Sequence, residues 1–138
     1  MTMQSNSEEK TMFKKIDHVE IIPKEAERTI NFYIDVLGFQ LISRIKVDVP
    51  PLKEVIFLKL GESVIEIMSV DNPGQVSGHQ WQIGYRAIAI KVENMTEAVK
   101  YLRDKNVVIS YEPVDLGSSY RAEILDPDGL TIELRQYK

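Results

Sequence analysis

The alternation of apolar and polar positions predicts short strands interrupted by helices. Residues 14–22 read KKIDHVEII, a period of two that predicts a strand. Pro23 ends this pattern, and apolar residues at helical spacing over 25–37 predict a helix that stops at Gly38. Three further strand patterns follow, at 39–47, 54–60 and 63–70. The first half of the chain is therefore predicted to have the order β-α-β-β-β.

The second half of the chain repeats this order of elements. Residues 71–84 are rich in residues that favour turns, which predicts a linker. A strand pattern then begins at Tyr85, and Asn94 is placed to cap a helix over 95–106. Three strand patterns complete the series, at 107–113, 118–126 and 129–136. The repeat predicts an α+β fold made of two tandem modules.

The repeat also sets the expected domain organisation. A single domain is expected over residues 14–138, because 138 residues with 43% hydrophobic content supply one compact core. Within it, module one covers 14–70, the linker 71–84 and module two 85–138. Residues 1–13 are polar and aperiodic, with too little apolar surface to offset the entropy of ordering, so a flexible N-terminal tail is expected.

Composition narrows the classes of partner. The net charge of −4 provides no basic field for phosphates, so neither nucleic acid nor an anionic membrane surface is expected as a partner. The absence of cysteine excludes disulfides, thiolate metal sites and a cysteine nucleophile, and agrees with a reducing cytoplasm. Charged residues interrupt every apolar run before the roughly 18 residues needed to span a bilayer. A soluble cytoplasmic protein that acts on a small molecule is expected.

Three ionisable residues occupy related positions in the two modules. His18 aligns with Ala87 at a separation of 69 positions, and Glu66 aligns with Glu133 at a separation of 67. Because side chains alternate along a strand, apolar neighbours that face the helices leave these ionisable groups on the opposite face. His18, Glu66 and Glu133 are therefore predicted to converge in one concavity.

The sequence resembles the vicinal oxygen chelate superfamily, which includes glyoxalase I, bleomycin-resistance proteins and extradiol dioxygenases. The blocks that carry the resemblance are IDHVEI, FYIDVLGF, VIEIM, AIAIKVENM and DPDGLTIEL, and they cover nearly the whole chain after residue 14. The residues of these blocks are most similar to those of glyoxalase I. The resemblance implies a glyoxalase-like fold, in which two β-α-β-β-β modules form a half-open mixed β-barrel. It also implies a homodimer, with each site assembled within one chain or across two chains.

The resemblance further implies a site for a divalent metal. Its four positions correspond to His18, Glu66, Ala87 and Glu133, and the third is usually histidine, so one ligand is missing. One imidazole and two carboxylates suit Zn, Ni, Co, Mn or Fe. His79, water or a chelating substrate could fill the missing position. Arg86 could not, because a guanidinium is not a metal ligand, and alternation predicts that it faces the helices.

Two functions remain open from the sequence. The first is a metal-dependent lyase, isomerase or epimerase of a small oxygenated metabolite, in which a metal polarises a carbonyl while Glu133 or Glu66 moves a proton on the adjacent carbon. The alternative is a metal-free protein that binds a drug or metabolite without catalysis, as Ala87 suggests. The candidate substrate-binding residues are Tyr85, Arg121 and Glu123. The identity of the substrate is left open.

Overall fold

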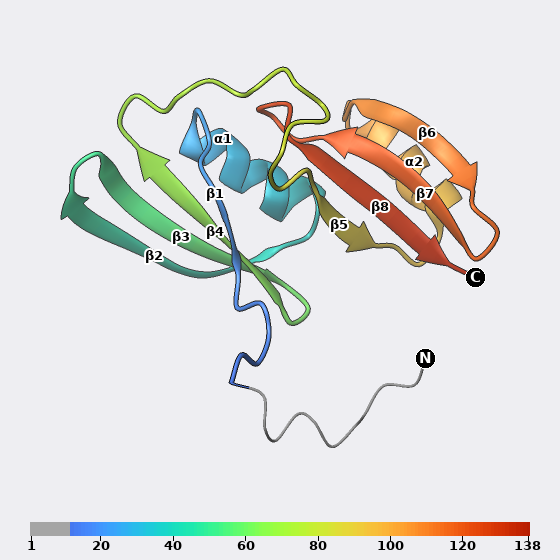
Figure 1. Ribbon diagram of the computed structural model, residues 1–138, viewed down its shortest axis with the longest axis horizontal. Coiled ribbons are helices and arrows are strands. Elements are labelled where there is room, and N and C mark those ends of the chain that lie inside the picture. The colour runs from blue at the N-terminus through green and yellow to red at the C-terminus, as the bar shows by residue number, and fades with distance from the viewer. Residues whose placement is uncertain (1–11) are drawn as a thin grey trace.

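Two four-stranded mixed sheets form the framework of the molecule (Figure 1). The computed structural model describes residues 12–138, so residues 1–11 of the expected tail lie outside the described part. The first sheet contains, in spatial order, β1 (Val19–Ile21), β4 (Ser63–Val70), β3 (Leu52–Leu60) and β2 (Gln40–Val49). The second contains β5 (Ile88–Lys91), β8 (Thr131–Tyr137), β7 (Ser119–Leu125) and β6 (Ile109–Asp115). Both sheets have the same topology, and the predicted α+β fold is confirmed.

One helical segment accompanies each sheet. The first consists of α1 (Ala26–Asn31), which continues as a π-helical turn, η2 (Phe32–Val36). Gly38 follows with a positive φ of 84°, a conformation that glycine adopts without a Cβ penalty. The second is α2 (Met95–Asp104), where the Asn94 side chain accepts a hydrogen bond from the Glu97 backbone N–H at 2.9 Å. The predicted cap is confirmed.

The core lies on the sheet faces that pack against the helices. Residues at alternate strand positions are buried there, and each Ile or Leu side chain among them contributes about 1.5–3 kcal/mol on burial. They are Ile21, Ile56, Leu58, Ile65 and Ile67 in the first sheet and Ala122, Ile124, Ile132 and Leu134 in the second. The residues between them point to the opposite, open faces, which fixes where the ionisable side chains lie.

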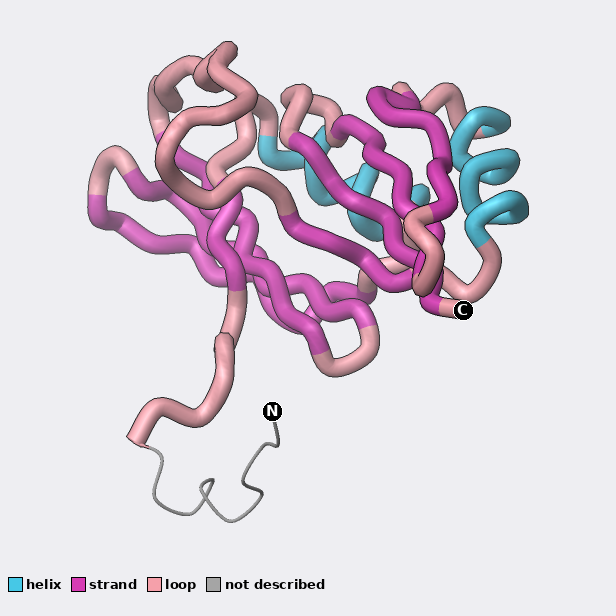
Figure 2. The backbone as a smooth tube through the Cα atoms, turned by 45° about the vertical axis from the view of Figure 1, so that its right-hand side comes forward, coloured by secondary structure: helices cyan, strands magenta, loops and turns pink. Residues whose placement is uncertain are grey.

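The two halves contact each other through helices and one turn. The Asp128 side chain, in the β7–β8 turn, accepts hydrogen bonds from the backbone N–H of Lys24, just before α1, and from the Arg28 side chain within α1. The Tyr101 hydroxyl of α2 donates to the Val36 carbonyl at 2.7 Å. Within the described residues the two sheets share no strand pairing, so the barrel stays open. Figures 1 and 2 show α1 between the two sheets.

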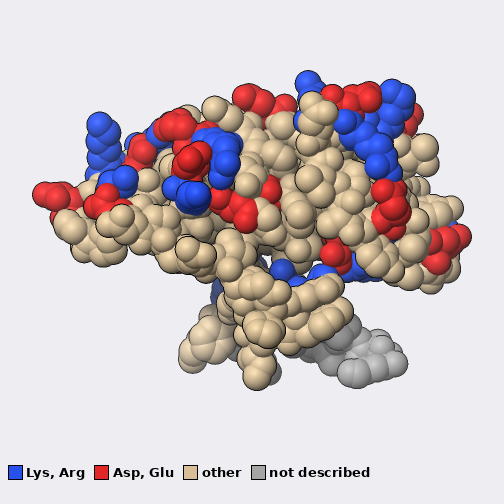
Figure 3. Space-filling view, turned by 90° about the horizontal axis from the view of Figure 1, so that it is seen from above, with Lys and Arg blue, Asp and Glu red and all other residues tan. Residues whose placement is uncertain are grey.

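The connection from β4 to β5 runs along one end of both sheets (Figures 1 and 2). In the described part of the chain, no helix has the length and apolar character needed to cross a membrane. Acidic and basic side chains lie next to one another on the face seen in Figure 3. That face therefore carries mixed charge rather than a field of one sign.

Two predicted strands are shorter than their sequence patterns. The pattern at 14–22 forms β1 only over Val19–Ile21, and the pattern that begins at Tyr85 forms β5 only from Ile88. Both strands lie at a sheet edge and pair with one neighbour, β4 or β8. Alternation shows where a chain can be extended, but it does not show where a hydrogen-bonding partner is present.

Candidate metal-binding cluster and adjoining cleft

The structure brings His18 and Glu66 together on the open face of the first sheet. His18 immediately precedes β1, which pairs in parallel with β4 so that Val19 lies opposite Ile65. The His18 Nε2 atom is 3.1 Å from Glu66 Oε1. Glu66 is 7% exposed, so its carboxylate is nearly removed from solvent and needs a charged or hydrogen-bonding partner. These two predicted ligands are neighbours.

Two further carboxylates surround His18. Glu20 lies opposite Glu66 in the strand register, and its Oε2 atom is 3.2 Å from His18 Nε2. The Asp17 Oδ2 atom is 2.9 Å from Nδ1 on the other side of the ring. Hydrogen bonds with Asp17 and Glu20 raise the pKa of His18, burial opposes this rise, and the charge of Glu66 adds to it. Neither Asp17 nor Glu20 was predicted to belong to this cluster, although Glu20 follows His18 at the spacing that shares a strand face.

Glu133 lies in the other sheet. It is on β8, where Arg121 Nε donates to its Oε1 atom at 2.8 Å and Arg135 Nε donates to its Oε2 atom at 3.1 Å. Among the described residues, one group of histidine and carboxylate side chains has ligand atoms that all lie within 4.8 Å of one another. This group consists of His18, Glu20 and Glu66. A single chain therefore brings together two of the three predicted ligands and places the third apart.

Arg86 lies on the open face of the second sheet. Its two terminal nitrogens contact both Glu123 oxygens, at 3.0 and 3.1 Å. The guanidinium also lies 5.2 Å from the centre of the Trp81 ring, within reach of a cation–π interaction. The expectation that Arg86 faces the helices is wrong, because β5 begins only at Ile88 and strand alternation does not extend back to Arg86. Ala87 is exposed in the same irregular segment.

Arg121 and Glu123 share one face of β7, as predicted, and the Arg121 guanidinium hydrogen-bonds to the Glu123 carboxylate. Glu123 is 6% exposed. Burial would raise the pKa of Glu123, but hydrogen bonds from Arg86 and Arg121 lower it below its usual value overall. The ion-paired carboxylate is the form that this environment favours. Arg121 and Glu123 thus form an ion pair on the open face of the second sheet.

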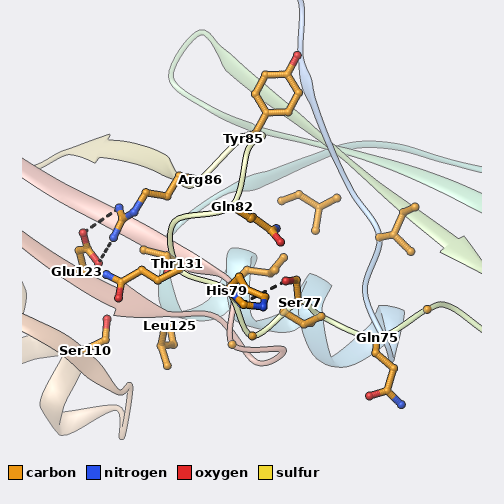
Figure 4. Close-up of a pocket in the computed structure, with 18 of the residues that line it drawn as sticks. Gln75, Ser77, His79, Gln82, Tyr85, Arg86, Ser110, Glu123, Leu125 and Thr131 are labelled. Carbon is orange, nitrogen blue, oxygen red and sulfur yellow. Dashed lines mark hydrogen bonds and ion pairs between the residues drawn. The ribbon is translucent and has the colours of Figure 1, made fainter.

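A cleft of about 730 Å³ adjoins these groups (Figure 4). Glu20, Arg86 and Glu123 all line it, so the His18 cluster adjoins the cleft through Glu20. Most of the remaining lining comes from the connection between the sheets: Gly74, Gln75, Val76, Ser77, Gly78, His79, Gln80, Gln82 and Tyr85. Amide and hydroxyl groups are frequent in this lining. Apolar side chains such as Ile22, Leu125 and Leu130 also line it, so the surface suits a ligand with both apolar and polar parts.

Tyr85 and His79 both line this cleft without belonging to a strand. Tyr85 precedes β5 and is fully exposed, so its expected place on a strand is wrong. The His79 backbone N–H donates to the Ser77 hydroxyl oxygen at 3.2 Å, and its imidazole lies outside the His18 cluster. His79 therefore does not occupy the position next to His18 and Glu66 in this chain.

The chain is similar to a known protein superfamily and to several of its members. Residues 15–134 match the model of the Glyoxalase/Bleomycin resistance protein/Dioxygenase superfamily. The lactoylglutathione lyase of Salmonella typhimurium strain LT2 is 34% identical over 128 residues, which cover 88% of this chain and 91% of that protein. The uncharacterised protein YaeR of Escherichia coli K12 is 30% identical, covering 88% of this chain and 95% of YaeR.

One solved structure has a fold similar to that of this chain. The glyoxalase family protein from Enterococcus faecalis superimposes with a TM-score of 0.77 at 29% sequence identity. The match covers 91% of this chain and 99% of that protein. The similarity therefore extends over both modules rather than one of them.

Proposed function

The chain belongs to the glyoxalase/bleomycin resistance protein/dioxygenase superfamily, and from that membership we propose that it is a divalent-metal-dependent lyase, isomerase or epimerase of a small oxygenated metabolite. The observation that supports this most strongly is the 3.1 Å separation between His18 Nε2 and Glu66 Oε1 on the open face of the first sheet. Two metal-bound atoms are separated by about 3.0–3.4 Å when each bond is about 2.1 Å long. The donor pair therefore fits a metal ion.

The residues have distinct proposed roles. His18, Glu66 and Glu133 would hold the metal, which supplies Lewis-acid polarisation of a substrate carbonyl when bound. Glu133 or Glu66 would accept a proton from the neighbouring carbon and return it. Because Arg121 and Arg135 bind both oxygens of Glu133, these contacts must loosen before Glu133 can serve. Glu123, which lines the cleft, and its neighbour Arg121 would orient the substrate, and Tyr85 would contact it.

A homodimer would supply the separated ligand. Glu133 lies outside the His18 cluster of its own chain, so we assign this position to Glu133 of a second copy, across an interface that joins unlike modules. Exposed apolar side chains support such an interface: Phe13 and Ile16 are each 83% exposed, Trp81 is 80% exposed and Ile83 is fully exposed. Surfaces of this kind commonly bind another protein surface.

Metal analysis followed by activity assays tests the proposal. Protein purified without chelator should contain a divalent metal and should convert 2-oxoaldehyde adducts or acyl-CoA epimers in a metal-dependent reaction. Glu66→Gln should reduce turnover at least about 100-fold, because it removes a metal ligand and a proton carrier. Glu62→Gln, an identical change in the exposed β3–β4 turn, should leave turnover unchanged. Failure to load any metal would reject the proposal.

Mixing two inactive variants tests the shared site. If His18 and Glu66 of one copy act with Glu133 of the other, a dimer of one Glu66→Gln and one Glu133→Gln chain keeps one intact site. Refolding an equal mixture should then restore about a quarter of wild-type turnover, since half of the dimers are mixed and each has one working site of two. Light scattering checks that dimers form. No recovery would show that each site belongs to one chain.

The second candidate function is metal-free sequestration of a drug or metabolite. The exposed Ala87 at the missing ligand position and the cleft of about 730 Å³ favour it. A ligand that binds the native state raises its stability. Screening by thermal shift should therefore find stabilisation by a bulky ligand that is unaffected by EDTA. Stabilisation that requires a divalent ion would count against this function.

A further inference from the structure

We propose that Glu20 is a metal ligand that takes the place left by Ala87, and that Asp17 positions His18 for this metal. The inference rests on the proposed metal site and specifies its composition. It yields a three-ligand cluster within one chain, made of His18 Nε2, Glu20 Oε2 and Glu66 Oε1. The three residues belong to adjacent strand segments with a fixed register, so the backbone positions them in advance.

The distances around His18 Nε2 support a cation between these atoms. Two carboxylate oxygens lie 3.1 and 3.2 Å from this one nitrogen. An imidazole nitrogen carries at most one proton and donates one good hydrogen bond, so it does not satisfy both carboxylates. Separations of about 3.0–3.4 Å are those expected between ligands of one ion with bonds near 2.1 Å. These separations therefore fit shared coordination of one ion by the three residues.

Asp17 provides an independent argument for the same site. Its carboxylate is 2.9 Å from His18 Nδ1, so with a metal on Nε2 the imidazole proton would lie on Nδ1 and be donated to Asp17. That tautomer directs the Nε2 lone pair toward Glu20 and Glu66. A carboxylate, a histidine and a metal in this order are a common arrangement in metalloproteins, in which the outer carboxylate orients the ring and increases its basicity.

Burial distinguishes the members of the cluster. The Glu66 side chain is 10% exposed, and His18 is its one charged partner within the described part of the chain. The Glu20 side chain is 57% exposed and lines the cleft. An ion held there would be anchored from the sheet side by Glu66 and would face the cleft beside Glu20. Open coordination positions on that side would be accessible to a ligand in the cleft.

Cobalt and zinc titrations of the full chain test this assignment. Apo protein should bind Co²⁺ with a visible absorption band that Zn²⁺ abolishes by competition. Glu20→Gln should weaken metal affinity about 10- to 100-fold, and Asp17→Asn should weaken it by a smaller factor. Glu62→Gln is the matched control and should bind as the wild type does. Circular dichroism confirms the fold of each variant.

The outcomes separate this inference from the proposed function. If Glu20→Gln binds both metals within twofold of wild type while Glu66→Gln does not, Glu20 is not a ligand, although a metal-dependent activity survives. If binding depends on Glu20 but no substrate is converted, the ligand assignment stands and the proposed activity fails. An absence of metal binding by the wild-type chain overturns the assignment.

Discussion

The Tyr33 hydroxyl donates a hydrogen bond to Asp126 Oδ2 at 3.1 Å, although 93 positions separate the two residues in sequence. Tyr33 belongs to η2, and Asp126 begins the β7–β8 turn. Both residues are buried, and Asp126 also accepts hydrogen bonds from the backbone N–H groups of Asp128 and Leu130. This contact joins the first helical segment to the second sheet. It is one of several contacts between the modules, together with those of Asp128 and Tyr101.

Tyr33→Phe is therefore expected to destabilise the protein. Loss of the hydroxyl leaves a buried carboxylate with one partner fewer, which costs about 1–3 kcal/mol of unfolding free energy. Urea denaturation measures this change. Tyr137→Phe serves as control: Tyr137 is 60% exposed, so its loss of a hydroxyl should cost less than about 0.5 kcal/mol. Equal effects of the two substitutions would show that the hydrogen bond does not stabilise the junction.

The same contact makes stability sensitive to alkaline pH. Burial raises the pKa of Tyr33 above its ordinary value, and the charge of Asp126, its hydrogen bond with Tyr33 and the charge of Asp128 raise it further. The unfolded phenol ionises near pH 10, so the contribution of Tyr33 is complete below that pH and is lost as pH rises toward the folded pKa. The loss is about 1.4 kcal/mol per pH unit. Wild-type stability should therefore fall more steeply above pH 10 than that of Tyr33→Phe, as measured by urea midpoints.

Local sequence signals predicted the regular elements well. The pattern at 63–70 matches β4, and Asn94 caps α2 as expected, because both depend on residues close in sequence. The signals failed near the linker, where Arg86 points to the open face. Hydrogen bonding of Arg86 with Glu123 over a separation of 37 positions determines that direction, and strand alternation contains no information about it.

Part of the candidate site could also be predicted from local sequence patterns. His18 and Glu66 lie on one face because alternation in two strand patterns directs both side chains there and the two strands pair in parallel. Glu133 lies on the corresponding face of the other sheet, but the relative placement of two sheets depends on contacts such as Tyr33–Asp126. Alternation predicts the face of a side chain. It does not predict which two faces meet.

Trp81 offers a spectroscopic test of the Arg86 position. It is the single tryptophan of the chain, and the Arg86 guanidinium lies 5.2 Å from its ring. A nearby positive charge attracts iodide, so Arg86→Gln should lower the ratio of iodide to acrylamide quenching roughly twofold. Arg103→Gln is the control, because Arg103 pairs with Glu112 on another surface. An unchanged ratio in Arg86→Gln would indicate that Arg86 and Trp81 are apart in solution.

Metal-dependent thermal stability offers the most direct test of the Glu66 carboxylate. An ion that binds the native state at 100 times its dissociation constant adds about 2.7 kcal/mol, which corresponds to a rise in Tm of roughly 5–10 °C for a chain of this size. Zn²⁺ should produce this rise in the wild type, and EDTA should reverse it. Glu66 is 7% exposed, so its replacement also alters apo stability, and the informative quantity is the shift on adding metal rather than Tm itself. Glu66→Gln should lose most of the shift, whereas Glu62→Gln should retain it. A full shift in Glu66→Gln would mean that the stabilising ion binds elsewhere.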